Sequence, residues 1–92
     1  MASKTFPNVT PAIWSCVQTT SVQQEGTVYD PPPPSSSGTA STKTIVGEVV
    51  LSFTVDSGQN TVTYKIVKKP FVVSENQIWN GIQATIDGCS SS

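Results

Sequence analysis

Acid–base chemistry in this chain would depend on carboxylates, because the sequence contains no histidine. Without an imidazole there is no Ser-His-Asp or Cys-His arrangement to activate a nucleophile. Imidazole zinc sites are excluded too, and two cysteines alone do not complete a structural zinc site. A pair of carboxylates could act as acid and base, but any chain with six acids offers such pairs: Glu25, Asp30, Glu48, Asp56, Glu75 and Asp87. We therefore expect no metal site and favour binding over catalysis.

Cofactor, nucleic-acid and membrane binding are also disfavoured. The sequence has neither a GxGxxG nor a GxxxxGK[ST] motif, so the residues that cradle nucleotide phosphates are missing and we expect no cofactor. It has no arginine and a net charge of −1, which argues against nucleic acid or an anionic membrane as the main partner. The longest apolar run is the three residues 49–51, too short to span a bilayer.

The side chains best suited to contact a ligand are aromatic. Trp14 and Trp79 could stack on a sugar or an aromatic ring, but each lies on the predicted apolar face of a short helix, where core packing is the simpler interpretation. A small-ligand pocket between sheet and helix would be lined by Phe53, Tyr64, Trp79 and Ile82.

The two cysteines, Cys16 and Cys89, stand near opposite ends of the chain. A disulfide between them would close a loop of about 70 residues and contribute on the order of 4 kcal/mol in the chain-entropy model. The alternative is two buried, inert thiols. The first ten residues contain no apolar segment of the signal-peptide kind, and the composition fits a secreted or a cytoplasmic protein.

A tetraproline run is the other candidate contact element. It should form a short polyproline II segment, able either to dock on an aromatic groove or to act as a stiff spacer. Its residues are Pro31, Pro32, Pro33 and Pro34. They begin a Pro/Ser-rich loop predicted at about 30–43, inside a single domain of residues 1–92.

The central third of the chain predicts a β-hairpin. Apolar residues alternate with polar ones in residues 45–55 and again in 61–67, and the turn-forming residues 56–60 join the two runs. The lysines that follow, Lys65, Lys68 and Lys69, are interpreted as protection of an exposed edge strand.

Residues 73–88 predict a helix, although 76–86 also fit a strand. Ser74 and Gln77 have the spacing of a capping box, and Gly88 falls where a left-handed C-terminal cap is expected. Near the start, Thr10 and Pro11 indicate a short helix over 11–17, with a strand as its rival, and 18–29 predict one or two strands.

Together these elements predict an α+β fold, a small antiparallel sheet of three to four strands with a C-terminal helix on one face; the alternative is an all-β sandwich. The favoured function is a non-catalytic binding or protein-interaction module, compatible with homo-oligomer formation. A small-ligand carrier is the alternative, and a carboxylate-dependent hydrolase is ranked last. The sequence does not identify the partner protein or small molecule, nor the cellular location.

Overall fold

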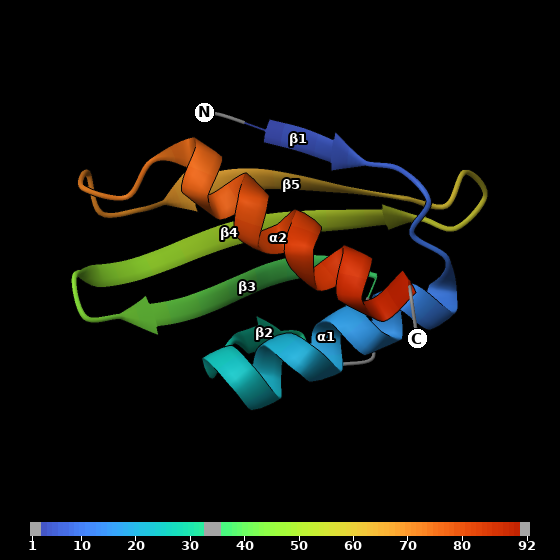
Figure 1. The fold of residues 1–92 in the computed structure, drawn as a ribbon, viewed down its shortest axis with the longest axis horizontal. Helices are drawn as coiled ribbons and strands as arrows, with labels where there is room; N and C mark the ends of the chain where they lie inside the picture. The colour runs from blue at the N-terminus through green and yellow to red at the C-terminus, as the bar shows by residue number, and fades with distance from the viewer. Residues whose placement is uncertain (1–2, 33–35, 91–92) are drawn as a thin grey trace.

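The computed structural model describes residues 3–32 and 36–90. Within them the chain forms, in order, β1 (Ser3–Phe6), α1 (Pro11–Glu25), β2 (Val28–Asp30), β3 (Ser37–Thr44), β4 (Gly47–Asp56), β5 (Thr61–Lys68) and α2 (Glu75–Ser90) (Figure 1).

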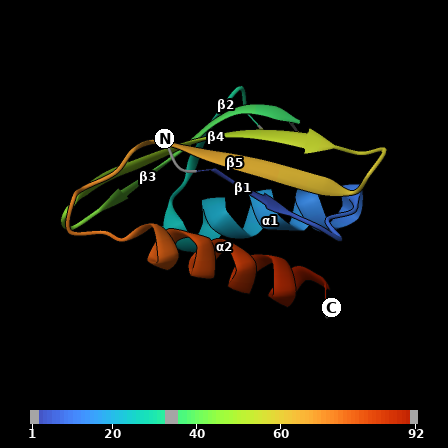
Figure 2. The ribbon, with the colours of Figure 1, turned by 90° about the horizontal axis from the view of Figure 1, so that it is seen from above.

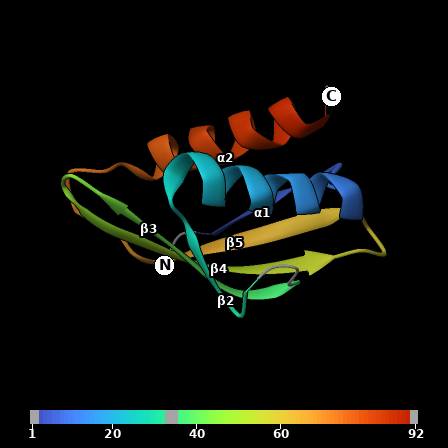
Figure 3. The ribbon, with the colours of Figure 1, turned by 90° about the horizontal axis from the view of Figure 1, so that it is seen from below.

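All five strands join one antiparallel sheet in the order β1-β5-β4-β3-β2. Both helices lie on the same face of that sheet, as Figures 2 and 3 show from opposite sides. The α+β class is confirmed, but the predicted count of three to four strands with one helix is wrong. The all-β sandwich is also wrong, because residues 75–90 are helical.

The central hairpin is confirmed as β4 and β5, which pair from Asp56↔Thr61 inward. The carboxylate of Asp56 accepts hydrogen bonds from the backbone N–H groups of Gly58 and Gln59, at 3.0 and 3.3 Å, and so fixes the turn. This is the local hydrogen bonding for which Asp is favoured in turns.

Strand β3 occupies the second half of the segment 30–43, for which the sequence predicted a loop. Its eight residues pair with β4 along their whole length, from Ser37↔Thr54 to Thr44↔Gly47. Its sequence, SGTASTKT, has almost no apolar residue, so the β-branched threonines and the ladder with β4 hold it as a strand rather than an alternating hydrophobic pattern. The connection from β2 is therefore shorter than predicted.

Helix α1 begins where the sequence predicts but runs further. The Thr10 hydroxyl caps it by accepting from the Ile13 N–H at 3.3 Å, and Pro11 takes the first turn. The helix continues to Glu25, so the strands predicted over 18–29 are wrong except for Val28 and Tyr29, which begin β2. Packing against the sheet overrides the weak helix propensity of its threonines and valines.

The helix α1 ends at Gly26, which has φ 69° and donates its N–H to the Ser21 carbonyl. This left-handed cap reverses the chain into β2. Glycine adopts the conformation without a steric penalty because it has no Cβ atom.

The capping box of α2 is confirmed. The Gln77 N–H donates to the Ser74 hydroxyl at 3.2 Å, and the Ser74 N–H donates to the Gln77 side-chain carbonyl at 2.9 Å. The helix extends to Ser90, so Gly88 lies inside it and is not the C-terminal cap.

The core lies between the sheet and the two helices. Trp14 is at its centre, with ring centroids 5.2 Å from Phe53, 6.2 Å from Tyr64 and 6.4 Å from Tyr29. Phe6 extends this cluster with an edge-to-face contact to Tyr64 at 5.9 Å. Such tilted and edge-to-face pairs are the favoured aromatic geometries.

The interpretation of the lysines as edge protection is wrong. Strand β5 lies between β1 and β4, and the edges of the sheet are the short strands β1 and β2. Lys68 lies 3.9 Å from the Glu48 carboxylate, and Lys69 donates to the Val73 carbonyl at 2.8 Å. Lys68 and Lys69 thus have local partners in the chain, and Lys65 lies on a part of β5 that pairs with both β1 and β4.

Candidate ligand cavity

A cavity of about 350 Å³ lies between the helical layer and the sheet. It sits under the C-terminal half of α1 and the N-terminal half of α2, over strands β2 to β5. Its mouth is marked by the lining residues that are also exposed to solvent, namely Glu25, Thr44, Gln77 and Gly81.

Aliphatic side chains form much of the cavity wall. On the sheet, Val49 and Leu51 share one face of β4 because alternate residues of a strand point the same way. On α2, Ile78 and Ile82 are four residues apart and so lie on one side of the helix. Val17 closes the wall from α1.

The space exists because short residues meet where the two layers face each other. Ala40 and Thr42 of β3 point toward the helices, and Gly81 of α2 also lines the cavity. A Cβ atom on Gly81 would have no heavy atom within 4 Å. Protein interiors are normally packed to crystal-like density, so a volume of this size in a small domain is a candidate binding site.

Two tyrosines bring hydroxyl groups to the wall. The Tyr29 hydroxyl lies 2.7 Å from that of Ser21, which in turn reaches the carbonyls of Val17 and Gln18 at 2.8 and 3.1 Å. Because the single Ser21 proton is directed at a helix carbonyl, Tyr29 is the donor in the hydroxyl pair. Burial raises the pKa of Tyr29, against the opposing effect of the Ser21 hydrogen bond.

Tyr64 differs from Tyr29 in having no such partner. Its ring contacts Phe6, Trp14 and Phe53, but no residue in the described ranges hydrogen-bonds its hydroxyl. Tyr64 is only 3% exposed, but its hydroxyl oxygen is not fully buried. Because Tyr64 lines the cavity, we infer that the hydroxyl is accessible from there. Burial raises the pKa of Tyr64 strongly, and this hydroxyl therefore stays protonated.

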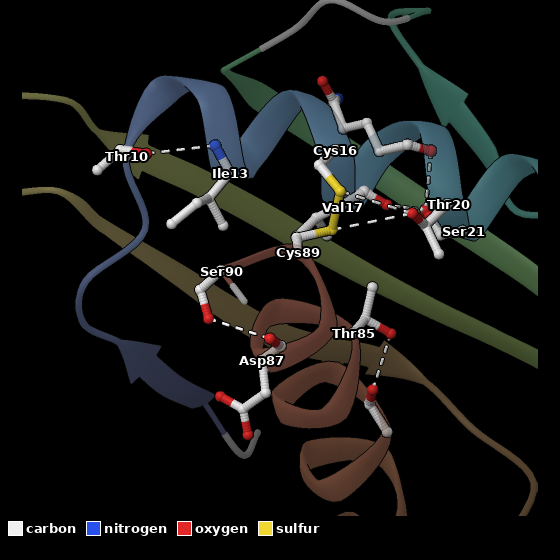
Figure 4. Close-up of a disulfide and its surroundings, with 12 residues drawn as sticks. Thr10, Ile13, Cys16, Val17, Thr20, Ser21, Thr85, Asp87, Cys89 and Ser90 are labelled. Atoms are coloured by element: carbon white, nitrogen blue, oxygen red, sulfur yellow. Dashed lines mark hydrogen bonds between the residues drawn. A yellow bond between two sulfur atoms is a disulfide. The ribbon is translucent and has the colours of Figure 1, made fainter. Parts of the chain in front are cut away.

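A disulfide joins the two helices (Figure 4). Cys16 of α1 and Cys89 of α2 are bonded, with Cα atoms 5.8 Å apart. The Thr20 hydroxyl lies 3.8 Å from each sulfur. The sequence left the bridge and the free thiols as alternatives, and the structure has the bridge.

The structure separates the aromatic candidates into two groups. Tyr64 and Ile82 line the cavity as the pocket hypothesis requires. Phe53, Trp14 and Trp79 are 2%, 6% and 8% exposed and belong to the core, which supports the packing interpretation of both tryptophans.

Sequence reasoning missed Tyr29 and Ser21, because the segment that carries them was assigned to strands. The spacing of eight residues between them, across a helix end and Gly26, was the available signal. Pro31 and Pro32 are exposed, whereas Pro33 and Pro34 lie outside the described residues.

Within residues 3–32 and 36–90, no three His, Cys, Asp or Glu side chains gather closely enough to hold a metal ion. None of the helices in that part of the chain has the length and apolar character needed to cross a membrane. No family model, curated protein or solved structure matches the chain.

Proposed function

We propose that the protein is a non-catalytic carrier of a small, largely apolar molecule, bound in the cavity between helices and sheet. The observation that carries the proposal is the cavity itself, about 350 Å³, whose wall exposes mostly apolar surface and also carries several hydroxyl groups. Small-molecule sites have this character, apolar surface with a small number of placed polar groups.

The size of the chain adds support. A domain of 92 residues buries a limited apolar area and has little stability to spare. Leaving Val49, Ile78 and Ile82 half-buried around an open volume forgoes packing that larger side chains at Ala40 or Gly81 would supply. Binding of a ligand recovers those contacts.

The test is binding of N-phenylnaphthylamine, an uncharged dye that fluoresces in apolar surroundings. Gly81→Leu places a large side chain at the cavity mouth and also favours the helix, so the variant should fold and lose most dye binding. Gly88→Leu is the matched control, since Gly88 is on the same helix, has equal space for a Cβ and does not line the cavity. Equal binding by the two variants, or no binding by the unmodified protein, contradicts the proposal.

A second candidate function is protein interaction, including self-association. The turn between β3 and β4 exposes Ile45 and Val46, and the segment before α2 exposes Phe71 and Val72. The two segments lie at the same end of the molecule (Figures 1 and 2). Exposed apolar residues gathered in this way are typical of contact surfaces.

Self-association predicts a dimer in sizing chromatography that an Ile45→Ser, Phe71→Ser double variant converts to monomer. A wild-type protein that is monomeric across the concentration range contradicts it, and leaves the carrier proposal unaffected.

A further inference from the structure

We propose that the cavity selects an uncharged amphiphile, an aliphatic alcohol in preference to a carboxylate, and that the Tyr64 hydroxyl binds its polar group. This inference rests on the proposed carrier function and names its ligand class. Three observations support it: the charges of the cavity wall, the hydrogen bonds at the N-terminus of α2, and the Tyr64 hydroxyl.

The charges of the wall disfavour an anion. Among the described residues that line the cavity, Glu25 is the one charged side chain, and no lysine contributes to the wall. Lys43 and Lys65 are neighbours of lining residues along β3 and β5, but alternate residues of a strand point to opposite faces, so these lysines lie on the face away from the helices. Lys69 has its ammonium directed to the Val73 carbonyl at 2.8 Å. A carboxylate ligand would lose water without gaining a counter-ion, and desolvating a charge in this way is costly.

The amides of Gln77 and Ile78, the residues in the first turn of α2 that line the cavity, do not supply an anion site either. Helix N-termini attract anions through N–H groups that lack partners. Here the Gln77 N–H already donates to the Ser74 hydroxyl, and the Ser74 N–H donates to the Gln77 side chain. The Ile78 N–H is also bonded, to the Ser74 carbonyl at 3.3 Å. The capping box therefore leaves these amides engaged.

The Tyr64 hydroxyl is the group suited to an uncharged ligand. It is buried in the aromatic cluster, reaches the cavity and has no hydrogen-bond partner among residues 3–32 and 36–90. A buried hydroxyl is stabilised by a partner, and a ligand alcohol can both donate to it and accept from it. The Tyr29 hydroxyl is already hydrogen-bonded to Ser21, so it has less capacity to bond a ligand.

The experiment displaces N-phenylnaphthylamine with dodecanol, dodecanoate and dodecylamine at neutral pH, with the alcohol below its solubility limit and the two ions below their critical micelle concentrations. The three compounds share one chain and differ only in the head group. We expect dodecanol to bind at least about tenfold more tightly than dodecanoate, a difference of roughly 1.4 kcal/mol. We also expect it to bind more tightly than dodecylamine, because Glu25 is exposed at the mouth, where water screens its charge.

Paired tyrosine variants assign the polar contact. Tyr64→Phe keeps the ring and should weaken dodecanol binding by roughly two- to tenfold, the effect of one neutral hydrogen bond. Tyr29→Phe is the matched control in the same cavity and should have a smaller effect, since that hydroxyl is already bonded to Ser21. Thermal unfolding of both variants checks that they fold.

The outcomes are distinguishable. Dodecanoate or dodecylamine binding as tightly as dodecanol overturns the selectivity while leaving the carrier function intact. Equal losses in the two tyrosine variants overturn the assignment to Tyr64. Failure of the dye and all three compounds to bind overturns the carrier function itself.

Discussion

The hydroxyl oxygens of Ser21 and Tyr29 lie 2.7 Å apart and join helix α1 to the edge strand β2. Strand β2 has only three residues and pairs on one side alone, with β3. The bond is thus a second attachment of β2 to the body of the molecule, in addition to its ladder. It also forms part of the cavity wall.

Removing either hydroxyl of this pair should destabilise the fold by about 1 kcal/mol. Ser21→Ala and Tyr29→Phe should share most of their cost, because both delete the same hydrogen bond. A double-mutant cycle in urea should therefore give a coupling of about 0.5–1.5 kcal/mol. Strict additivity of the two costs contradicts a direct bond.

Reduction of the disulfide should lower the free energy of unfolding by about 4 kcal/mol, because the bridge closes a loop with a sequence separation of 73. Urea unfolding with and without reductant measures the loss. A Cys16→Ala, Cys89→Ala double variant should have the same free energy of unfolding as the reduced protein, and reductant should not change that value. Alkylation of thiols in the untreated native protein contradicts the bridge.

Alkaline pH should destabilise the protein through Tyr64. Burial, and to a smaller degree the charge on Tyr29, raise the pKa of Tyr64 above the ordinary value of 10.0. Above that pH the unfolded chain loses the Tyr64 proton and the folded protein keeps it, so the unfolded state binds fewer protons and stability falls as pH rises. The contribution of Tyr64 to stability is therefore fully present below the pKa of this tyrosine in the unfolded chain, and it decreases as the pH rises above that value.

Unfolding free energies measured at rising pH from neutral to above 10.0 should therefore fall less steeply in Tyr64→Phe than in the wild type. The two proteins differ only at residue 64, so the contributions of all other groups cancel in the comparison. Parallel curves for the two proteins contradict the assignment.

Gly38→Ala should cost about 1–3 kcal/mol, the range for a strained backbone position. Gly38 is the second residue of β3 and has φ 141°. A Cβ atom at this position would lie 2.7 Å from the Pro31 side chain and closer still to the Asp30 carbonyl oxygen. Gly58→Ala is the control, since its Cβ meets only Asp56, at an ordinary 3.4 Å, and should be close to neutral. Thermal unfolding compares the two, and equal stabilities contradict the steric argument.

Local signals in the sequence were sufficient for the hairpin and for both helix starts. The alternation of β4 and β5, the Thr10 cap and the Ser74–Gln77 box all act within a few residues, so each could be recognised without knowledge of the fold. The disulfide could be named as a possibility because only one pairing exists for two cysteines.

The remainder of the fold depends on contacts that are distant in sequence. Residues 18–25 carry two threonines and one valine, which favour strands, and only packing on the sheet makes them helical. Strand β3 lacks an apolar pattern and is specified by its ladder with β4. The cavity depends on Ala40 of β3 and Gly81 of α2 lining one space although they are far apart in the sequence, which no local periodicity encodes.

The position of the Cys16–Cys89 bond has a mechanical consequence for the cavity. The helices are antiparallel neighbours fastened at one end, near the C-terminus of α2, whereas the lining residues Glu25 and Gln77 stand at the other end (Figure 1). The bond therefore fixes the spacing of the two helices at that end, whereas no covalent link joins them at the end where Glu25 and Gln77 line the cavity.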